Sequence, residues 1–211
     1  MADIDFGQVL RIFLVLLISL TVHEAAHAWS AERFGDRTAR MLGRVSLNPA
    51  VHIDPIGTIL FPLIAIVTGL PVLGWAKPVP VSIQNLRGNW KEKYMVIAAA
   101  GPASNIVLAA VAAIALRVMN AGDPDGFAEG MVPTLLEWAV RLNVLLAVFN
   151  MIPVPPLDGG NVLSGLLRGP ASEMFDRLRP YGFLILYGLL LTGIVSMLVS
   201  PPAAWLISAL L

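Results

Sequence analysis

The sequence contains no cysteine and few charged residues. Charged residues make up 13% of the 211 residues, whereas hydrophobic residues make up 57%. Without cysteine the chain has no disulfide framework, no thiolate metal site and no cysteine nucleophile. Charge is too scarce for an ordinary soluble domain, so the composition predicts an all-α, multi-span membrane protein that forms one helical bundle over residues 1–211.

The chain also lacks an excess of either charge. Fourteen Lys and Arg residues balance fourteen Asp and Glu residues, which leaves no basic surface of the kind that binds nucleic acid. Asp3 and Asp5 precede the first apolar segment where a signal peptide would have basic residues, so we expect this segment to be retained. The predicted surroundings of the protein are therefore the lipid bilayer.

Ionisable side chains are rare in the apolar segments, with one exception at the end of the first segment. His23 and His27 lie one turn apart on one face of a helix and can bind a single metal ion, while Glu24 faces the water that such an ion activates. In a soluble helix, this HExxH pattern is often only a solvated turn. Inside an apolar span a charged group costs about 2.5–3.5 kcal/mol or more, so it is usually paired, metal-bound or functional.

Long apolar stretches predict membrane spans at about residues 6–30, 94–116, 133–152 and 181–199. Arginines follow the first span and mark its cytoplasmic end, namely Arg33, Arg37, Arg40 and Arg44. Counting back from Arg33 places His27 and His23 about 9 and 15 Å inside that boundary. We therefore expect the site to lie within the membrane, nearer the cytoplasm, with the acidic loop 119–132 on the opposite side.

The region between the first two of these spans is less regular. Residues 38–47 alternate in part and contain Gly43, which predicts a short pair of strands at the membrane surface. Residues 48–58 form a series of turns. Positive residues flank the short apolar stretch 56–70 on both sides, which predicts a re-entrant segment. A short span in a thinned bilayer is the alternative.

Two polar features accompany the predicted site. Residues 74–81 contain two prolines and must be extended. This segment is either a docking edge for a peptide substrate, contacted by Trp75 and Lys77, or a rigid connector. In the span 94–116, Asn105 is the one strongly polar side chain, and it either contacts the substrate or bridges two helices by hydrogen bonds.

A third metal ligand is predicted where the span 133–152 ends. Residues 150–160 hold three prolines and two glycines, and such irregular backbone at membrane depth is tolerated only under protein or beside a wet cavity. Asp158 lies there, at about the depth of the histidines. His23, His27 and Asp158 thus supply the three ligands of a catalytic site for one Zn²⁺ ion, a metal that this ligand set favours over magnesium or calcium.

Two further residues have predicted chemical roles. Glu24 takes a proton from the attacking water and delivers it to the leaving amine. Asn150, about two turns before Asp158, either donates its amide to the developing oxyanion or supports the site structurally.

Five ordered motifs connect these features to a known family: HEAAH (23–27), NPAVHIDPIGT (48–58), GWAKPVPV (74–81), AAAGPASN (98–105) and NMIPVPPLDGG (150–160). The chain resembles the site-2 protease family of intramembrane zinc metalloproteases, and most of all its small bacterial and archaeal members without a PDZ domain. The resemblance implies a core of three spans around zinc. It also implies that His23, His27 and Asp158 are ligands, Glu24 is the base and Asn150 assists substrate or oxyanion binding, in a prokaryotic cell (inner) membrane.

The predicted function is hydrolysis of peptide bonds in or near the membrane-spanning segments of other proteins. His52 and Asp54 either fix a turn near Pro55 by hydrogen bonds or support the metal site. Two alternatives use the same His and Asp residues: a metal or proton transporter, and a membrane scaffold without proteolysis. Nothing in the sequence sets the oligomeric state.

Overall fold

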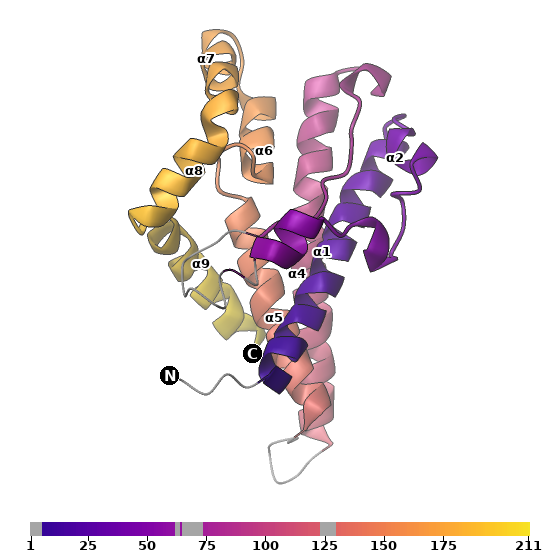
Figure 1. Ribbon diagram of the computed structural model, residues 1–211, viewed down its shortest axis with the longest axis vertical. Coiled ribbons are helices and arrows are strands. Elements are labelled where there is room, and N and C mark those ends of the chain that lie inside the picture. Colours follow the sequence, from indigo (N-terminus) through magenta and orange to yellow (C-terminus); the bar gives the residue numbers. More distant parts are fainter. Residues whose placement is uncertain (1–5, 62–63, 65–73, 123–129) are drawn as a thin grey trace.

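The protein, seen in a computed structural model whose description covers residues 6–61, 64, 74–122 and 130–211, is built from helices (Figure 1). Within this described part there is no strand, and three helices are long and apolar enough to cross a membrane. They are α1 (Phe6–Arg33), α4 (Trp90–Ala121) and α5 (Met131–Asn150). The all-α membrane class predicted from composition is confirmed, and the three predicted core spans coincide with these helices.

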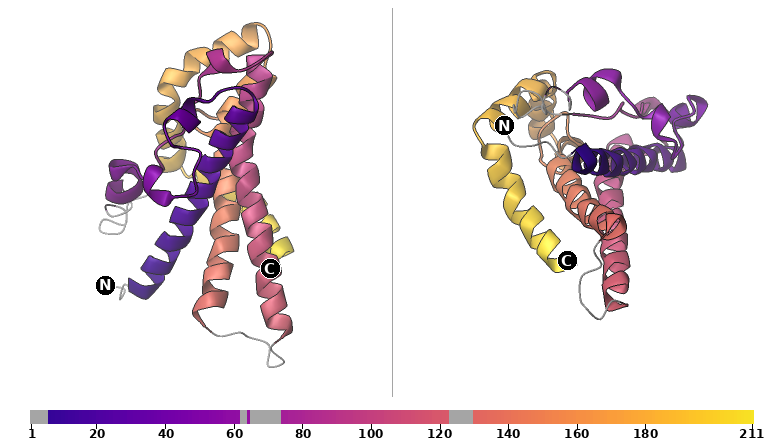
Figure 2. Two further views of the ribbon diagram at one scale, coloured as in Figure 1. Left: turned by 90° about the vertical axis from the view of Figure 1, so that its right-hand side faces the viewer. Right: turned by 60° about the horizontal axis from the view of Figure 1, so that its bottom comes forward.

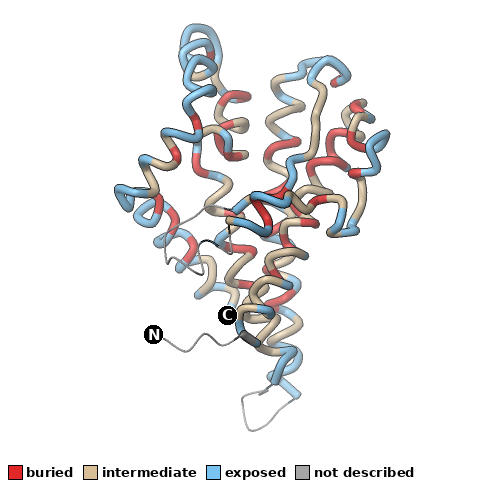
Figure 3. The backbone as a smooth tube through the Cα atoms, in the orientation of Figure 1, coloured by how far each residue is buried: buried red, intermediate tan, exposed pale blue. Residues whose placement is uncertain are grey.

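Helix α4 packs against α1, α5 and α6 (Asp158–Leu166) (Figure 2). Its buried residues include Ala98, Gly101, Asn105, Ala109 and Ala113. Because these side chains are short and recur every three to four residues, the neighbouring helices can approach closely. Figure 3 shows the buried residues where the helices meet, whereas the ends of α4 and α5 near residues 122–130 are largely exposed.

Helix α5 ends at Asn150, and residues 151–157 form a non-helical turn before α6 begins at Asp158. Two glycines make the turn possible. A Cβ atom at Gly159 would lie 2.3 Å from the Met151 carbonyl oxygen, and one at Gly160 would lie 2.7 Å from the Pro155 nitrogen. The predicted irregular segment is thus a compact turn, and Asp158 is the first residue of the helix that follows it.

The strand pair predicted for residues 38–47 is wrong. Thr38–Met41 is a short helix, α2, and the chain then turns at Gly43 with a φ of +67°. The reason is local: both the backbone N–H and the hydroxyl of Thr38 donate to the Asp36 carboxylate, which ties the start of α2 to the end of α1. Such side-chain bonds favour helical turns over strands.

Short helical turns connect α2 to α4, namely η1 (Pro49–Val51), η2 (Pro55–Leu60) and η3 (Ile83–Asn85). The start of the predicted re-entrant segment is therefore helical. Residues 62–63 and 65–73 lie outside the described residues, so the re-entrant course of 56–70 stays a prediction.

The region predicted as a last span, at about 181–199, is helical but contains a break. After α7 (Pro170–Leu178) and η4 (Arg179–Tyr181), the chain forms α8 (Gly182–Leu191) and a separate helix, α9 (Ile194–Leu210). Gly193, between them, has a φ of +77°, a conformation that ends helices and that glycine adopts without strain. The chain bends there by 76°, and α9 then packs against α5.

Candidate metal centre

The two histidines of α1 and the aspartate of α6 meet inside the helical bundle. The Nε2 atoms of His23 and His27 are 3.0 Å apart. The Asp158 Oδ2 atom lies 3.0 Å from the first and 3.4 Å from the second. In the part of the chain that the structure describes, these residues form the one group of His, Cys, Asp or Glu side chains with the spacing of a metal site.

Hydrogen bonds fix which nitrogen of each ring carries the proton. The Nδ1 atom of His23 is 2.6 Å from the side-chain oxygen of Asn105, and that of His27 is 2.7 Å from the backbone oxygen of Ile97. Because both partners are acceptors, each Nδ1 carries a hydrogen, and each Nε2 presents a lone pair. This is the arrangement usually found around histidines that bind metals.

Three lone-pair atoms therefore converge on one point. The histidines are only 5% and 8% exposed, and the buried Asp158 Oδ2 receives no hydrogen bond that satisfies normal geometry. A single proton can bridge at most two of the three atoms, whereas a metal ion binds all of them. A metal ion would therefore satisfy all three atoms at once, whereas buried acceptors left unpaired are costly.

The spacing fits zinc. A tetrahedral zinc ion with ligands at about 2.0–2.1 Å holds them about 3.3–3.4 Å from one another, and the three donor atoms here are 3.0–3.4 Å apart. Two imidazoles and one carboxylate also match the ligand set of catalytic zinc sites, which leave a fourth position open. His23, His27 and Asp158 are thus the residues that could hold the ion.

Asn105 belongs to a chain of buried amides behind His23. Its Nδ2 donates to the Asn143 Oδ1 at 2.8 Å and to the Ser19 backbone oxygen at 3.3 Å, while Asn143 donates to the Ala139 backbone oxygen at 2.8 Å. Asn105 is 0% exposed. The predicted substrate contact by Asn105 does not fit this burial, because the amide is already used in bridging α1 to α5.

Gly101 on α4 lies directly against the metal centre. A Cβ atom at Gly101 would be 2.4 Å from the His27 Nε2 and 2.6 Å from the His23 Nε2. The absence of a side chain on α4 at this point leaves room for the two imidazoles. Sequence reasoning also missed Asn143, although it shares with Asn105 the signal of a polar side chain in an apolar span.

Glu24 contacts the extended segment 74–81. Its side chain is half-buried, and its Oε2 accepts a hydrogen bond from the Val79 N–H at 2.9 Å. Figure 1 shows this segment as a tube beside α1 and α4. The carboxylate thus lies at the boundary between the helical bundle and an irregular part of the chain.

Asn150 closes α5, and one of its amide hydrogens is donated to the Leu146 backbone oxygen at 2.9 Å. The Nδ2 atom carries a second hydrogen. The oxyanion role predicted for Asn150 depends on that second hydrogen and stays a prediction.

Trp75 and Lys77 occupy different environments. The Trp75 ring packs on Gly57 and lies in edge contact with Phe61 and Phe183, with centroid distances of 5.0 and 6.2 Å. The Lys77 side chain is exposed. The Trp75 contacts show that its ring holds η2 and α8 together, and a substrate contact by either residue stays a prediction.

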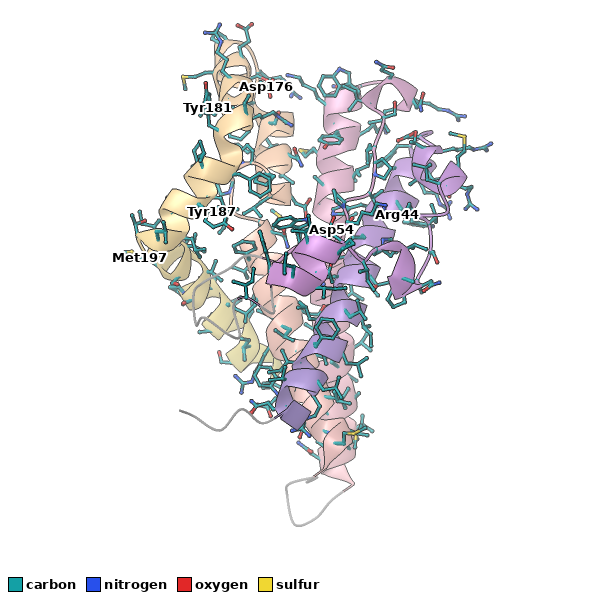
Figure 4. The ribbon with its side chains drawn as sticks, viewed as in Figure 1. Arg44, Asp54, Asp176, Tyr181, Tyr187 and Met197 are labelled. Atoms are coloured by element: carbon teal, nitrogen blue, oxygen red, sulfur yellow. The ribbon has the colours of Figure 1, made fainter. Side chains whose placement is uncertain are left out.

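His52 and Asp54 stabilise the turns around η2, and Figure 4 labels Asp54 in this part of the molecule. The Asp54 Oδ1 accepts from the Ile56 and Gly57 N–H groups at 2.9 and 2.8 Å, which caps η2. His52 is buried, with its Nε2 atom 2.9 Å from the Ser46 backbone oxygen and its Nδ1 atom 3.5 Å from the Arg44 guanidinium. This geometry corresponds to the turn-fixing alternative, and neither residue belongs to the metal-binding group.

Comparison with known proteins agrees with this site. The model of peptidase family M50 matches residues 11–124 and 118–192. YwhC from Bacillus subtilis strain 168, named as a candidate zinc metalloprotease, is 36% identical over 193 residues, which cover 89% of this chain and 83% of YwhC. Rip2 from Mycolicibacterium smegmatis, named likewise, is 30% identical over 178 residues, which cover 83% of this chain and 64% of Rip2.

A more distant relative is the zinc metalloprotease MJ0392 from Methanocaldococcus jannaschii, which is 24% identical over 206 residues. The match covers 90% of this chain but only 46% of MJ0392. The chain thus spans most of YwhC and less than two thirds of the other two relatives. No solved structure gives a significant match to the chain.

Proposed function

Because this chain belongs to peptidase family M50, the site-2 protease family of zinc metalloproteases, we propose that it cleaves peptide bonds in or beside the membrane-spanning segments of other proteins. The observation that carries the proposal is the meeting of His23, His27 and Asp158 on helices of a membrane bundle, with Glu24 next to them. A peptidase centre at this place acts on chains that enter the membrane.

The proposed roles follow from the donor atoms. His23, His27 and Asp158 hold one zinc ion, which when bound lowers the pKa of a water molecule and polarises the scissile carbonyl. Glu24 accepts the proton of the attacking water and transfers it to the leaving amine. Asn150 donates its second amide hydrogen to the oxygen that gains charge.

The substrate has to lose helical structure before it is cut. In an intact helix each carbonyl is held in an i to i−4 hydrogen bond, which hides the bond to be attacked. Residues 38–47 form α2 and a turn instead of a strand, so they offer no edge for an extended substrate. We also propose that the centre faces the cytoplasmic half of a cell membrane, since the arginines near the end of α1 mark that side.

Replacement of Glu24 by Gln tests this function. In proteoliposomes with a single-span substrate, E24Q should lower cleavage by about 10²–10⁴-fold, the usual contribution of a general acid–base, and should keep its zinc. The matched control is E32Q, the same change near the end of α1 where Glu32 pairs with Arg40 at the surface. An E24Q variant that still cleaves at the wild-type rate would remove Glu24 from the mechanism.

The same proteoliposomes address the two alternatives. Zinc flux without proteolysis would identify a transporter, and the absence of both activities would identify a scaffold. To find the natural substrate, membrane proteomes of cells that carry the wild-type chain or E24Q can be compared. A membrane protein that accumulates intact only with E24Q would be the substrate.

A further inference from the structure

Three charged side chains hold the backbone of the extended segment 77–82. Arg44 donates to the Lys77 carbonyl oxygen, the Glu24 Oε2 accepts from the Val79 N–H at 2.9 Å, and the Asp36 Oδ2 accepts from the Ser82 N–H at 2.7 Å. Glu24 lies on α1, Asp36 lies between α1 and α2, and Arg44 lies just after α2. Among the described residues the segment has no strand partner, so these bonds replace the ladder that would otherwise hold an extended chain.

The middle bond has a special position in the sequence. Val79 stands between Pro78 and Pro80, and proline has no N–H. The N–H of Val79 is therefore the single donor over these three residues, and it goes to Glu24. The two outer anchors are buried, Arg44 at 6% exposed and Asp36 at 0%, so the segment is held on both sides of Val79.

This arrangement leaves little for a substrate strand to pair with. The Lys77 N–H donates to the His52 backbone oxygen at 2.8 Å, and the Val79 N–H donates to Glu24. With prolines at 78 and 80, no N–H between residues 77 and 80 remains for an incoming peptide. An added strand would find only acceptors there, which is a poor edge for β-pairing.

We propose that Val79 is a positioning residue for the general base. Its N–H holds the Oε2 atom of Glu24, which leaves the Oε1 atom to receive the proton, and the segment 77–82 serves this purpose rather than substrate docking. The inference rests on the proposed role of Glu24. A free glutamate side chain samples several rotamers, whereas a base must stay within about 2.6–3.2 Å of the proton that it removes.

The test removes one hydrogen atom from the backbone. Valine 79 is replaced by its α-hydroxy acid through nonsense suppression, so that an ester oxygen replaces the N–H and the side chain is kept. Val79→Pro removes the same donor by ordinary mutagenesis. The matched control is the α-hydroxy acid at Val81, because the bond to Glu24 comes from the Val79 N–H and not from the Val81 N–H. Turnover, KM and zinc content are measured with a reconstituted single-span substrate.

We expect kcat of the ester variant at Val79 to fall about tenfold to a hundredfold, the effect of a misplaced catalytic group, with KM within twofold of the wild type and one zinc ion retained. The Val81 ester should match the wild type. Val79→Pro should lose at least as much activity as the Val79 ester.

Three outcomes would overturn the inference. An unchanged kcat would show that the bond does not position Glu24, and a raised KM with unchanged kcat would show that the segment docks the substrate. Loss of zinc from the Val79 ester would show that the segment acts through the metal site. None of these touches the proposed function, which fails instead if the wild-type chain does not cleave the reconstituted substrate.

Discussion

His23 and Glu24 are neighbours in the sequence, yet the molecule holds them by different means. His23 is held by Asn105 on α4, a side chain that is 0% exposed and is itself held by Asn143 on α5. Glu24 is held by a backbone N–H in a segment without regular structure. Helix packing thus fixes the metal ligand His23, and the extended segment 77–82 fixes the Glu24 carboxylate. Metal binding and proton transfer should therefore be separable by mutation.

The largest expected effect is on zinc affinity, where α4 packs against the two histidines. In Gly101→Ala, the new methyl group would lie 2.4 Å from the His27 Nε2, and because Gly101 is in the middle of α4, the backbone cannot move away alone. Zinc affinity should fall by more than the roughly 10- to 100-fold that loss of an outer partner costs. Zinc content of the purified protein after dialysis measures this.

Gly122→Ala is the control for that substitution, because a Cβ atom there would meet the Met119 carbonyl oxygen at an ordinary 3.5 Å. It should bind zinc like the wild type. Full zinc occupancy in Gly101→Ala would mean that α4 does not press on the imidazoles as the structure indicates.

The next effect concerns the amide chain. Asn105→Ala leaves the His23 Nδ1–H without its acceptor, and Asn143→Ala frees the Asn105 amide to rotate. Each should weaken zinc binding by about 10- to 100-fold, as outer-shell losses do. Competition with a chelator of known affinity measures the constants. Because both residues act through one ring, the double variant should lose less than the sum of the two single losses. Additive losses of zinc affinity would contradict the idea that Asn105 and Asn143 act through the one ring of His23.

Much of this site could be predicted because charge in an apolar span is costly. That argument selected His23, Glu24 and His27 in the first span, and the depth of Asp158 selected it as the third ligand. The distances of 3.0–3.4 Å between the three donor atoms agree with that reasoning. The three long spans followed equally from length and hydropathy.

Where the structure differs from the prediction, the cause is a local interaction that a hydropathy pattern does not show. The helical turn at Thr38 depends on the Asp36 carboxylate, and the break in the last span depends on the conformation of Gly193. The role of Gly101 could not be predicted, because the residue that crowds a histidine on another helix is known only once the two helices are docked. The bond from Val79 to Glu24 likewise joins residues far apart in the sequence.

The smallest expected effect concerns the extended segment 77–82, where the Asp36 carboxylate binds the Ser82 N–H. Burial raises the pKa of Asp36, but hydrogen bonds from Thr38, Asn85 and the Ser82 N–H outweigh it and hold the pKa below its ordinary value. Ionised Asp36 therefore stabilises the folded state above the unfolded pKa of about 3.9, and this stabilisation is lost as the pH falls through the lower, folded pKa.

Asp36→Asn tests whether the segment that holds Glu24 is independent of the helices that hold His23. An amide nitrogen in place of Oδ2 faces the Ser82 N–H donor to donor, so the free energy of unfolding at pH 7 should fall by about 1.5–3 kcal/mol, the usual worth of a hydrogen bond to a charged group. Denaturation in detergent at pH 7 and below pH 4 measures this, and the gap between variant and wild type should narrow at the acidic pH. Zinc affinity should stay unchanged, since Asp36 touches no residue of the amide chain. If Asp36→Asn lost zinc as readily as Asn105→Ala, the segment 77–82 and the metal centre would form one unit. Metal binding and proton transfer would then not be separable by mutation.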